Sequence, residues 1–424
     1  MPRNFLQLLS LLAVVVFTLP LQADNWPRFR GPSQAGIANV DSVPTKWGDT
    51  ENVLWKTDMP GPGASSPVVF NNRIYVTCYT GYGLNEEEPG DKANLKRNLV
   101  CVDRENGRIL WNQEIPADAE HTKDFSGFVA LHGFASSTPN VDDTGVYVYY
   151  GTTGAAAYDL DGTHRWTVSL GDKTHAFGTA NSPVLYKDLV ILNAGVEGNA
   201  IVGLDKKTGQ EVWKHEGVNR SWNTPILVTA NGRDELIYSE EGAVRALDPA
   251  TGEELWHSKG IDDYICPSVI PVGDDMVVAM GARKNTTIAI RTGGSGDVTD
   301  SHLVWELDKG SNVSSPTYHD GHLYWVSESK GIAYCADAKT GEVVYQERME
   351  PRPKLIYASP VVAGGKLYYV TRENGTYVID ANPEYKLITI NEFEADKSIA
   401  NASPAIVDNK IYLRTNKALY CIGK

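Results

Sequence analysis

The chain has 424 residues, of which 42% are hydrophobic, and it carries a formal net charge of −14 at pH 7. An acidic chain without a basic run lacks the electropositive face that nucleic acids require, so a nucleic-acid partner is excluded. Its five cysteines are too few for a disulfide framework at this length.

Residues 1–23 have the features of a secretory signal peptide. Arg3 precedes an apolar stretch that ends in small residues at Ala23, after which we predict cleavage. Leu21 departs from the expected cleavage pattern, which leaves an uncleaved anchor as the alternative. No cysteine lies near this junction, so a lipid anchor is not expected, and no other segment is apolar enough to span a bilayer. We predict a periplasmic or secreted protein in which residues 24–51 lead into the folded domain.

One short pattern recurs along the rest of the chain. A proline that follows a small residue precedes an apolar run at Pro67, Pro139, Pro183, Pro225, Pro267, Pro316, Pro360 and Pro404. The spacings are 72, 44, 42, 42, 49, 44 and 44 residues, and a period in the forties is typical of β-propellers. Within residues 359–393, four runs rich in Val, Ile and Tyr alternate with turns, as in a blade of four antiparallel strands, A to D from the hub outward. We predict that residues 52–424 form one all-β domain, an eight-bladed β-propeller.

Strand D of each unit carries a large side chain at one position, which is in turn Trp111, Trp166, Trp213, Trp256, Trp305, Tyr345 and Ile388. In several units a turn with Asp and, four residues later, Gly precedes it, as in Asp205 and Gly209. Asp can cap such a turn and Gly can adopt its positive φ. The recurrence indicates core packing rather than a cofactor site. We expect Trp213 to be buried, and Trp222, in the following D–A loop, to be exposed.

The two ends of the chain are predicted to complete one blade. After Pro404 the sequence holds strands A, B and C, and it stops at Lys424 before a strand D. Near the N-terminus, Trp55 lies in a strand-D pattern at residues 52–59, with no proline of the repeat before it. We predict that this N-terminal strand pairs with the strand around Leu419 in the last blade. Closing the ring removes the sheet edges that would otherwise be exposed.

Three cysteines share one position of the repeat near the end of strand C: Cys101, Cys335 and Cys421. Other units place Ala, Gly or Val there, so the position favours a small apolar side chain. Cys266 is aligned with a position that is Ser or Thr in other units. Cys78 lies on the strand beside that of Cys101, where a cross-strand disulfide and two free thiols are both open.

Two insertions explain the long first spacing. Residues 79–99 join strands B and C, and residues 116–137 join strand D to the next blade. Since both kinds of loop emerge on one face of a propeller, the insertions should lie side by side and form a wall or a lid. The acidic tip at 86–91 is either a solvated loop or a calcium loop, and the aromatic residues of 116–137 either pack on the rim or stack on a ligand. A third break, residues 291–306, belongs to the opposite face and is read as a long turn rather than a phosphate-binding loop.

Polar and aromatic residues of the shorter loops on the insertion face are expected to surround the mouth of the central channel. Together they predict a mixed-charge funnel for a polar small molecule, a saccharide or a peptide. The candidate residues are His132, Trp222, Asn223, Glu240, Asp262, Tyr264, Arg283, Asn312, Glu328, Tyr357, Arg372, Glu373 and Arg414. No catalytic motif is found, and the metal-like sequence from His319 to His322 aligns with an ordinary A–B turn.

Segments such as LDKKTGQEVWKHE and LDPATGEELWHSK resemble the pyrroloquinoline-quinone (PQQ) repeat, and NWPRFRGP resembles the opening of secreted PQQ-like propellers. One branch of that superfamily, the quinoprotein alcohol dehydrogenases, implies bound PQQ and calcium and a pair of adjacent cysteines. This chain lacks adjacent cysteines, and no position matches the calcium ligands or the catalytic aspartate. The other branch resembles the assembly factor BamB and implies non-catalytic binding of a partner protein through loops. We therefore expect a binding or scaffolding propeller without a cofactor, with a small PQQ-dependent oxidoreductase as the alternative.

Overall fold

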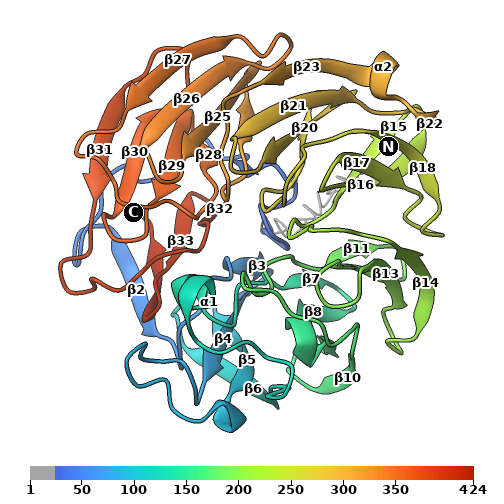
Figure 1. Cartoon of the computed structure of the whole chain (residues 1–424). Helices are drawn as coiled ribbons and strands as arrows, with labels where there is room; N and C mark the ends of the chain where they lie inside the picture. Colours follow the sequence, from blue (N-terminus) through green and yellow to red (C-terminus); the bar gives the residue numbers. More distant parts are fainter. Residues whose placement is uncertain (1–23) are drawn as a thin grey trace, which may run out of the picture.

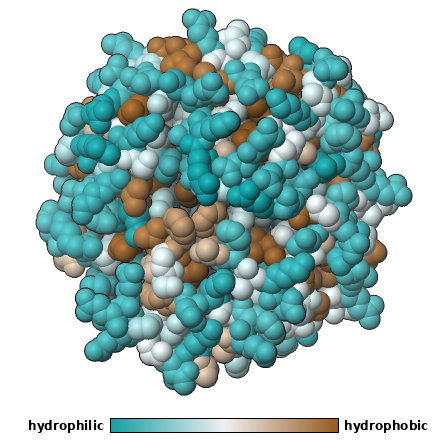
Figure 2. All heavy atoms as spheres, viewed as in Figure 1, coloured by the Kyte–Doolittle hydropathy of each residue, from teal (hydrophilic) through white to brown (hydrophobic). Residues whose placement is uncertain are grey.

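The structure, a computed structural model, describes residues 24–424. Eight sheets surround a central axis (Figure 1). Each contains four antiparallel strands, and their order in the sheet leads from the hub, strand A, to the rim, strand D. The predicted all-β, eight-bladed β-propeller is confirmed. Seen down the same axis, the surface is mostly hydrophilic towards the rim (Figure 2). The predicted signal peptide lies outside the described residues, and the boundary at residue 52 stays a prediction.

Blade 1 contains β3 (Val68–Phe70), β4 (Arg73–Thr80), β5 (Lys96–Asp103) and β6 (Ile109–Pro116), and blade 2 contains β7 (Asn140–Asp142), β8 (Gly145–Tyr149), β9 (Ala155–Tyr158) and β10 (His164–Val168). Blade 3 contains β11 (Val184–Tyr186), β12 (Leu189–Ala194), β13 (Ala200–Asp205) and β14 (Glu211–Glu216), and blade 4 contains β15 (Ile226–Ala230), β16 (Arg233–Glu240), β17 (Ala243–Leu247) and β18 (Glu254–Lys259). Blade 5 contains β19 (Ile270–Val272), β20 (Met276–Gly281), β21 (Thr286–Arg291) and β23 (Leu303–Leu307), and blade 6 contains β24 (Thr317–His319), β25 (His322–Ser327), β26 (Ile332–Asp337) and β27 (Val343–Arg348). Blade 7 contains β28 (Val361–Ala363), β29 (Lys366–Val370), β30 (Thr376–Asp380) and β31 (Leu387–Asn391), and blade 8 contains β32 (Ala405–Val407), β33 (Lys410–Arg414), β34 (Ala418–Ile422) and β2 (Val53–Asp58). Short parallel strands extend blades 7 and 4, namely β1 (Ile37–Ala38) and β22 (Gly296–Asp297). The helical segments are α1 (Gly127–His132), α2 (Thr299–His302) and the 3-10 turns η1 (Lys92–Asn94) and η2 (Gly151–Thr153).

A chain of hydrogen bonds links neighbouring blades at the hub. In seven junctions the backbone N–H at the start of one blade donates to a hydroxyl of the next, over 2.9–3.1 Å. The residues in this chain are Ser66, Thr138, Ser182, Thr224, Ser268, Ser315, Ser359 and Ser403. Ser268, and not Cys266, therefore holds the hydroxyl position of blade 5. The alignment on Pro267 is wrong by two residues, because in this unit the hydroxyl follows the proline.

The strand-D tryptophans join the blades further out. Trp166 faces the small Ala157 across its own sheet, and its ring lies against Gly209 in the turn of the next blade. Its indole N–H donates to the Lys206 carbonyl of that turn at 3.0 Å. Trp55 and Trp305 donate to the next blade in the same way, at 3.2 and 3.1 Å. The recurring Trp, the turn Gly and the small strand-C residue are thus one packing unit, as the sequence predicts for core residues.

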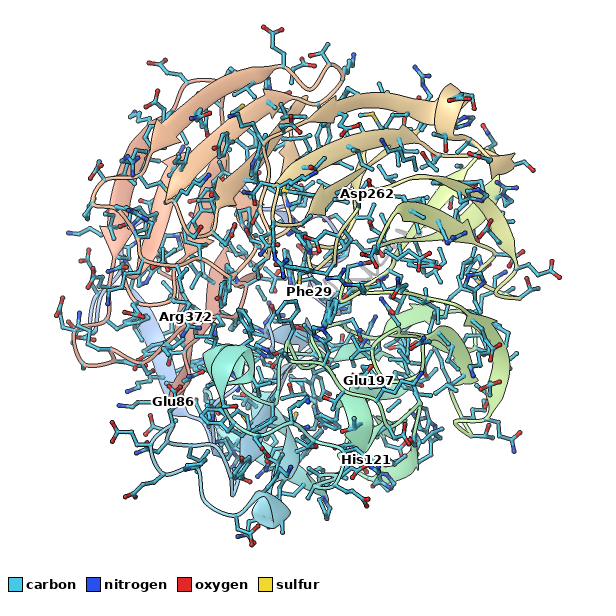
Figure 3. All side chains as sticks on the ribbon, viewed as in Figure 1. Phe29, Glu86, His121, Glu197, Asp262 and Arg372 are labelled. Carbon is cyan, nitrogen blue, oxygen red and sulfur yellow. The ribbon has the colours of Figure 1, made fainter. Side chains whose placement is uncertain are left out.

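The N-terminal segment crosses the ring and closes one end of the channel. Trp26 forms an antiparallel bridge with Val69 in blade 1, and the buried guanidinium of Arg30 donates to the carbonyls of Ser315 and Pro316 at blade 6. Gln34 exchanges two hydrogen bonds with the backbone of Leu227 in blade 4, and β1 continues along blade 7. Between these anchors, Phe29 lies at the centre of the ring (Figure 3).

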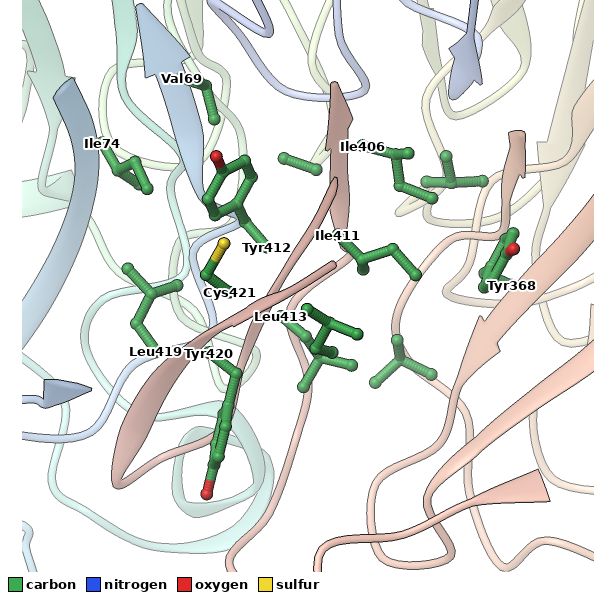
Figure 4. Packing of buried hydrophobic residues seen from close by; sticks show 14 of the residues in the cluster. Val69, Ile74, Tyr368, Ile406, Ile411, Tyr412, Leu413, Leu419, Tyr420 and Cys421 are labelled. Carbon is green, nitrogen blue, oxygen red and sulfur yellow. The ribbon is translucent and has the colours of Figure 1, made fainter. Parts of the chain in front are cut away.

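The ring closes through both ends of the chain, as predicted. β2 pairs antiparallel with β34, with Thr57 opposite Leu419 and Trp55 opposite Cys421. Side chains of the closing blade fill the space between its two neighbours, as Figure 4 shows for Ile411 and Tyr412. The last blade is therefore built like the others although its strands come from opposite ends of the sequence.

All five cysteines are free thiols. Cys78 pairs with Asn98 across the sheet and Cys101 pairs with Tyr75, so the two cysteines are not opposite each other and the disulfide alternative is wrong. Cys101, Cys335 and Cys421 face Trp111, Tyr345 and Trp55, which explains why their repeat position requires a small side chain.

The Gly-rich break in blade 5 has a structural role. Gly293 and Gly294 accept hydrogen bonds from Asn231 and Arg233 of blade 4, and β22 pairs with β18 at the outer edge of that blade. The loop thus covers an exposed sheet edge, away from the insertions.

We predict that Gly209→Ala destabilises the fold more than Gly232→Ala. The two glycines have φ values of +72° and +77°, so an added Cβ strains the backbone similarly, by roughly 1–2 kcal/mol. At Gly209 the Cβ would also lie 2.7 Å from the Trp166 ring, whereas at Gly232 nothing lies within 4 Å. Overpacking should add roughly 1–3 kcal/mol, to be measured as the free energy of unfolding in urea. Equal losses would contradict the docking role of Trp166.

Candidate functional site

The two insertions pack against each other on one face. The Phe134 ring of the second insertion contacts Tyr79 and Tyr82 of the first, with centroid distances of 5.3 and 5.8 Å. Lys92 and Asp124 form an ion pair across the two segments at 3.0 Å. The tips reach outward, with Glu86 and His121 near the periphery (Figure 3). The aromatic residues thus form a small core of their own, which supports the rest of the second insertion.

Helix α1 carries the second insertion inward over the hub (Figure 1). The Leu131 carbonyl accepts hydrogen bonds from Arg372 and, at 2.9 Å, from Asn401. His132 donates from Nε2 to the Phe177 carbonyl at 2.8 Å, while its Nδ1 lies 2.6 Å from the Ser136 hydroxyl. Burial and the nearby Arg372 cation hold the pKa of His132 below its ordinary value, so the neutral imidazole is favoured. The helix is thereby fixed to both sides of the channel.

A cavity of about 340 Å³ lies between α1 and the N-terminal segment. Phe29 forms its floor, and aromatic rings from several blades form its walls. Seven of the hub hydroxyl residues line it, all except Ser182. The cavity reaches solvent beside Phe128, which is 55% exposed, and Figure 2 shows apolar residues near the centre of this face. A blind pocket that combines aromatic walls with inward-facing polar groups is typical of ligand sites.

The structure brings together six of the thirteen candidate residues in the wall of this cavity: His132, Trp222, Tyr264, Asn312, Glu328 and Tyr357. Arg283 and Arg372 stack on the rings of Tyr264 and Tyr357, at 5.3 and 5.2 Å from the centroids. The remaining candidates do not line it.

Three of those remaining candidates serve the fold. Asn223 is buried and donates to the Ser239 carbonyl, Glu240 is buried and paired with Arg245, and Arg414 is buried and donates to Ser65 and Thr77. Glu373 forms a surface ion pair with Lys354, and Asp262 is exposed on the surface.

Trp222 is buried rather than exposed, which corrects the expectation for this loop. Only 3% of its surface is accessible. Its indole N–H donates to the Gly178 carbonyl at 2.8 Å, and its ring packs on His175 and Phe177 from the preceding blade. These partners belong to a distant part of the sequence, so no local pattern marks Trp222 as buried.

Sequence reasoning missed several cavity residues. Phe29 lies in the lead-in segment, outside the repeat, and Phe177 lies in a D–A loop that carries no insertion. The hub hydroxyls could be found from the sequence, because each comes directly before a repeat proline, except in blade 5, where Ser268 comes directly after it. The sequence shows the proline pattern, but only the structure shows that the hydroxyl residues beside these prolines line a pocket.

The comparisons with known proteins fit this fold. A family model described as outer membrane protein assembly factor BamB matches residues 48–226 and 240–422. The chain belongs to this BamB family. A search of curated proteins finds no match. BamB from Moraxella catarrhalis is 14% identical with a TM-score of 0.60, over 88% of this chain and 97% of its own.

Solved enzymes share the BamB-like fold as well. A europium-containing methanol dehydrogenase has a TM-score of 0.66 at 11% identity, over 95% of this chain and 98% of its own. A quinohemoprotein alcohol dehydrogenase from Comamonas testosteroni has a TM-score of 0.64 at 11% identity, over 95% and 81%. At these identities the likeness establishes the propeller fold alone. Among residues 24–424 no helix is long and apolar enough to cross a bilayer.

The cavity residues do not fit PQQ with calcium. Glu328 is the one carboxylate among the residues that line the cavity, and they include no Lys or Arg to bind an anionic quinone. Within residues 24–424, no three His, Cys, Asp or Glu side chains gather as metal ligands, whereas calcium takes six to eight oxygens. Cys266 in the wall has no adjacent cysteine.

A buried carboxyl group supports the wall behind α1. Glu197, in the loop between β12 and β13, is 1% exposed. The Tyr149 hydroxyl donates to it at 2.7 Å, and the Thr179 hydroxyl donates to its other oxygen. Both donors are neutral, and burial raises the pKa of Glu197 above its ordinary value despite these hydrogen bonds.

We predict that Glu197→Gln raises the melting temperature in alkaline but not in acidic solution. A carboxyl group whose pKa is higher in the folded than in the unfolded state stabilises the fold at pH values below its unfolded-state pKa. This stabilisation is lost as the pH rises through the folded-state pKa. Glutamine does not ionise, so the variant should match the wild type near pH ~4 and melt higher near pH ~8. Circular dichroism at both pH values measures this, with the exposed Glu373→Gln as control. A wild type that melts higher than Glu197→Gln at the alkaline pH would contradict the prediction.

Proposed function

We propose that the protein is an extracytoplasmic, non-catalytic binding propeller that engages a partner protein through the insertion face and its central cavity. The observation that carries the proposal is the position of α1. The second insertion is not needed to complete a blade, yet it extends to the hub and forms one wall of a blind cavity. Extra material that shapes a pocket rather than the repeat indicates binding.

Two further observations support this function. The family is described as an outer membrane protein assembly factor, which is a binding role. The cavity also lacks the donor set for PQQ and calcium, as described above. An extracytoplasmic location rests on the predicted signal peptide with cleavage after Ala23.

Site-specific photocrosslinking tests the binding face. A benzophenone amino acid replaces Phe128 at the cavity mouth, or Val212 on the rim of blade 3, both of which are 55% exposed. A third position, Asp320, lies in an A–B turn of the opposite face. We expect irradiation of living cells to give a discrete crosslinked protein from position 128 and none from the two controls.

Two outcomes would contradict the proposal. Crosslinks of equal yield from all three positions would remove the assignment to this face. A lack of crosslinks at position 128, together with dye reduction that depends on added PQQ and calcium, would instead support the oxidoreductase alternative. Each variant is first checked for the wild-type melting transition, because a propeller that does not close would lose its partner for a trivial reason.

A further inference from the structure

We propose that the cavity binds a primary alkylammonium group, as carried by a lysine side chain, with its charge beside Glu328 and its carbon chain along the aromatic wall. This deepens the proposed function and rests on it, because it specifies what the partner inserts.

Glu328 places a single negative charge in the wall. One carboxylate oxygen accepts hydrogen bonds from the backbone N–H of Asn312 at 3.1 Å and from the side-chain hydroxyl of Ser311 at 3.4 Å. Neighbouring acidic side chains on this face are neutralised within the chain: Glu240 by Arg245, Glu241 and Asp263 by Arg220, and Glu373 by Lys354. Glu328 has no such partner among those ion pairs. Glu328 is half-buried in the wall and has no ion-pair partner within residues 24–424, so its negative charge attracts a cation in the cavity.

Asn312 adds an unused acceptor beside Glu328. Its amide nitrogen donates to the Tyr264 hydroxyl at 2.9 Å, which fixes the side chain. Its carbonyl oxygen is shielded from solvent and has no donor in the described part of the chain. Buried acceptors normally have partners, so the orphaned oxygen indicates a missing donor. A primary ammonium carries three N–H donors, which the carboxylate oxygens of Glu328 can accept directly; the Asn312 oxygen can accept one only after its side chain turns towards the cavity.

The aromatic wall suits a cation with an apolar stem. Tyr264 lies 4.9 Å from Phe177 and 6.3 Å from Trp222, centroid to centroid. The rings of Tyr264 and Tyr357 already hold arginines at the mouth, Arg283 and Arg372, which shows that guanidinium groups are accepted there. Cations are attracted to such rings, and a lysine stem buries its methylenes along apolar surface while its head stays polar. The three arginines over these rings, Arg220, Arg283 and Arg372, also repel a further cation, so the negative charge of Glu328 is needed to hold it.

Calorimetric titration of the full chain with small probes tests the charge requirement. Nα-acetyl-lysine amide is compared with Nα-acetyl-norleucine amide, which keeps the butyl stem and lacks the ammonium. We expect the lysine probe to bind at least ~10-fold more tightly. Glu328→Gln should remove this preference, whereas Glu373→Gln, on the same face but outside the cavity wall, should keep it. n-Pentylamine shows whether the free amine suffices or the amino-acid backbone is also read.

Cys266 reports the location of the bound probe. It lines the cavity and is partly exposed, whereas the other four cysteines are buried. Lysine amide should slow its alkylation by N-ethylmaleimide in the wild type and not in Glu328→Gln, with both proteins showing the same melting transition. Equal binding of the norleucine probe, an unchanged preference in Glu328→Gln, or no binding of either amine would overturn the proposal.

The two hypotheses fail separately. A crosslink at position 128 without amine binding would leave partner binding intact and remove the ammonium site. Amine binding that protects Cys266 without any crosslink at position 128 would keep the ammonium site and remove the protein partner, leaving a free amine as the ligand.

Discussion

The hydrogen bond from the first backbone N–H of one blade to a hydroxyl of the next sets the geometry of the whole ring. Such a bond tolerates only a few tenths of an ångström, and seven junctions repeat it within 0.2 Å, between 2.9 and 3.1 Å. At seven of the eight junctions, neighbouring blades therefore meet in the same way at the smallest radius. The tryptophan that docks on the next blade's turn fixes the same relation further out. Two contacts at different radii fix the angle between neighbouring blades, and repetition of similar contacts around the axis brings the ring to closure.

The cavity is a consequence of this hub. Because the inner end of each blade must present a Ser or Thr, no large side chain from the repeat fills the axis. The space is limited instead by segments outside the repeat, with the N-terminal residues below and α1 above. Both are held by side chains that reach across the ring, Arg30 to blade 6 and Arg372 to α1. The repeat thus supplies the walls, and the two segments that depart from it determine the depth and the opening.

The sequence predicts most of the fold because blade packing is local and periodic. Proline spacing, the strand-D aromatics and the missing last strand lead to eight blades and to the closure by Trp55. The site is less predictable, since its residues acquire their environment through distant contacts. Trp222 is buried by the rings of His175 and Phe177, which lie more than forty residues earlier in the sequence. In blade 5 the hub hydroxyl belongs to Ser268, which follows the repeat proline instead of preceding it, so alignment on the proline points to Cys266. Phe29 belongs to the NWPRFRGP segment, whose pattern indicates the family but does not show that this ring faces the channel.

The closing blade also imposes an order on folding. In the order of the described strands, β2 precedes those of blade 1 and its partner β34 comes last, so β2 and the segment of Trp26 and Arg30 have no complete docking surface until blade 8 has been made. Blades 1 to 7 can assemble one after another from neighbouring sequence, as repeat units do. The first residues must wait for the last, with an unpaired strand edge at each end of the growing arc. Shielding of those two edges would therefore matter only before the ring is shut.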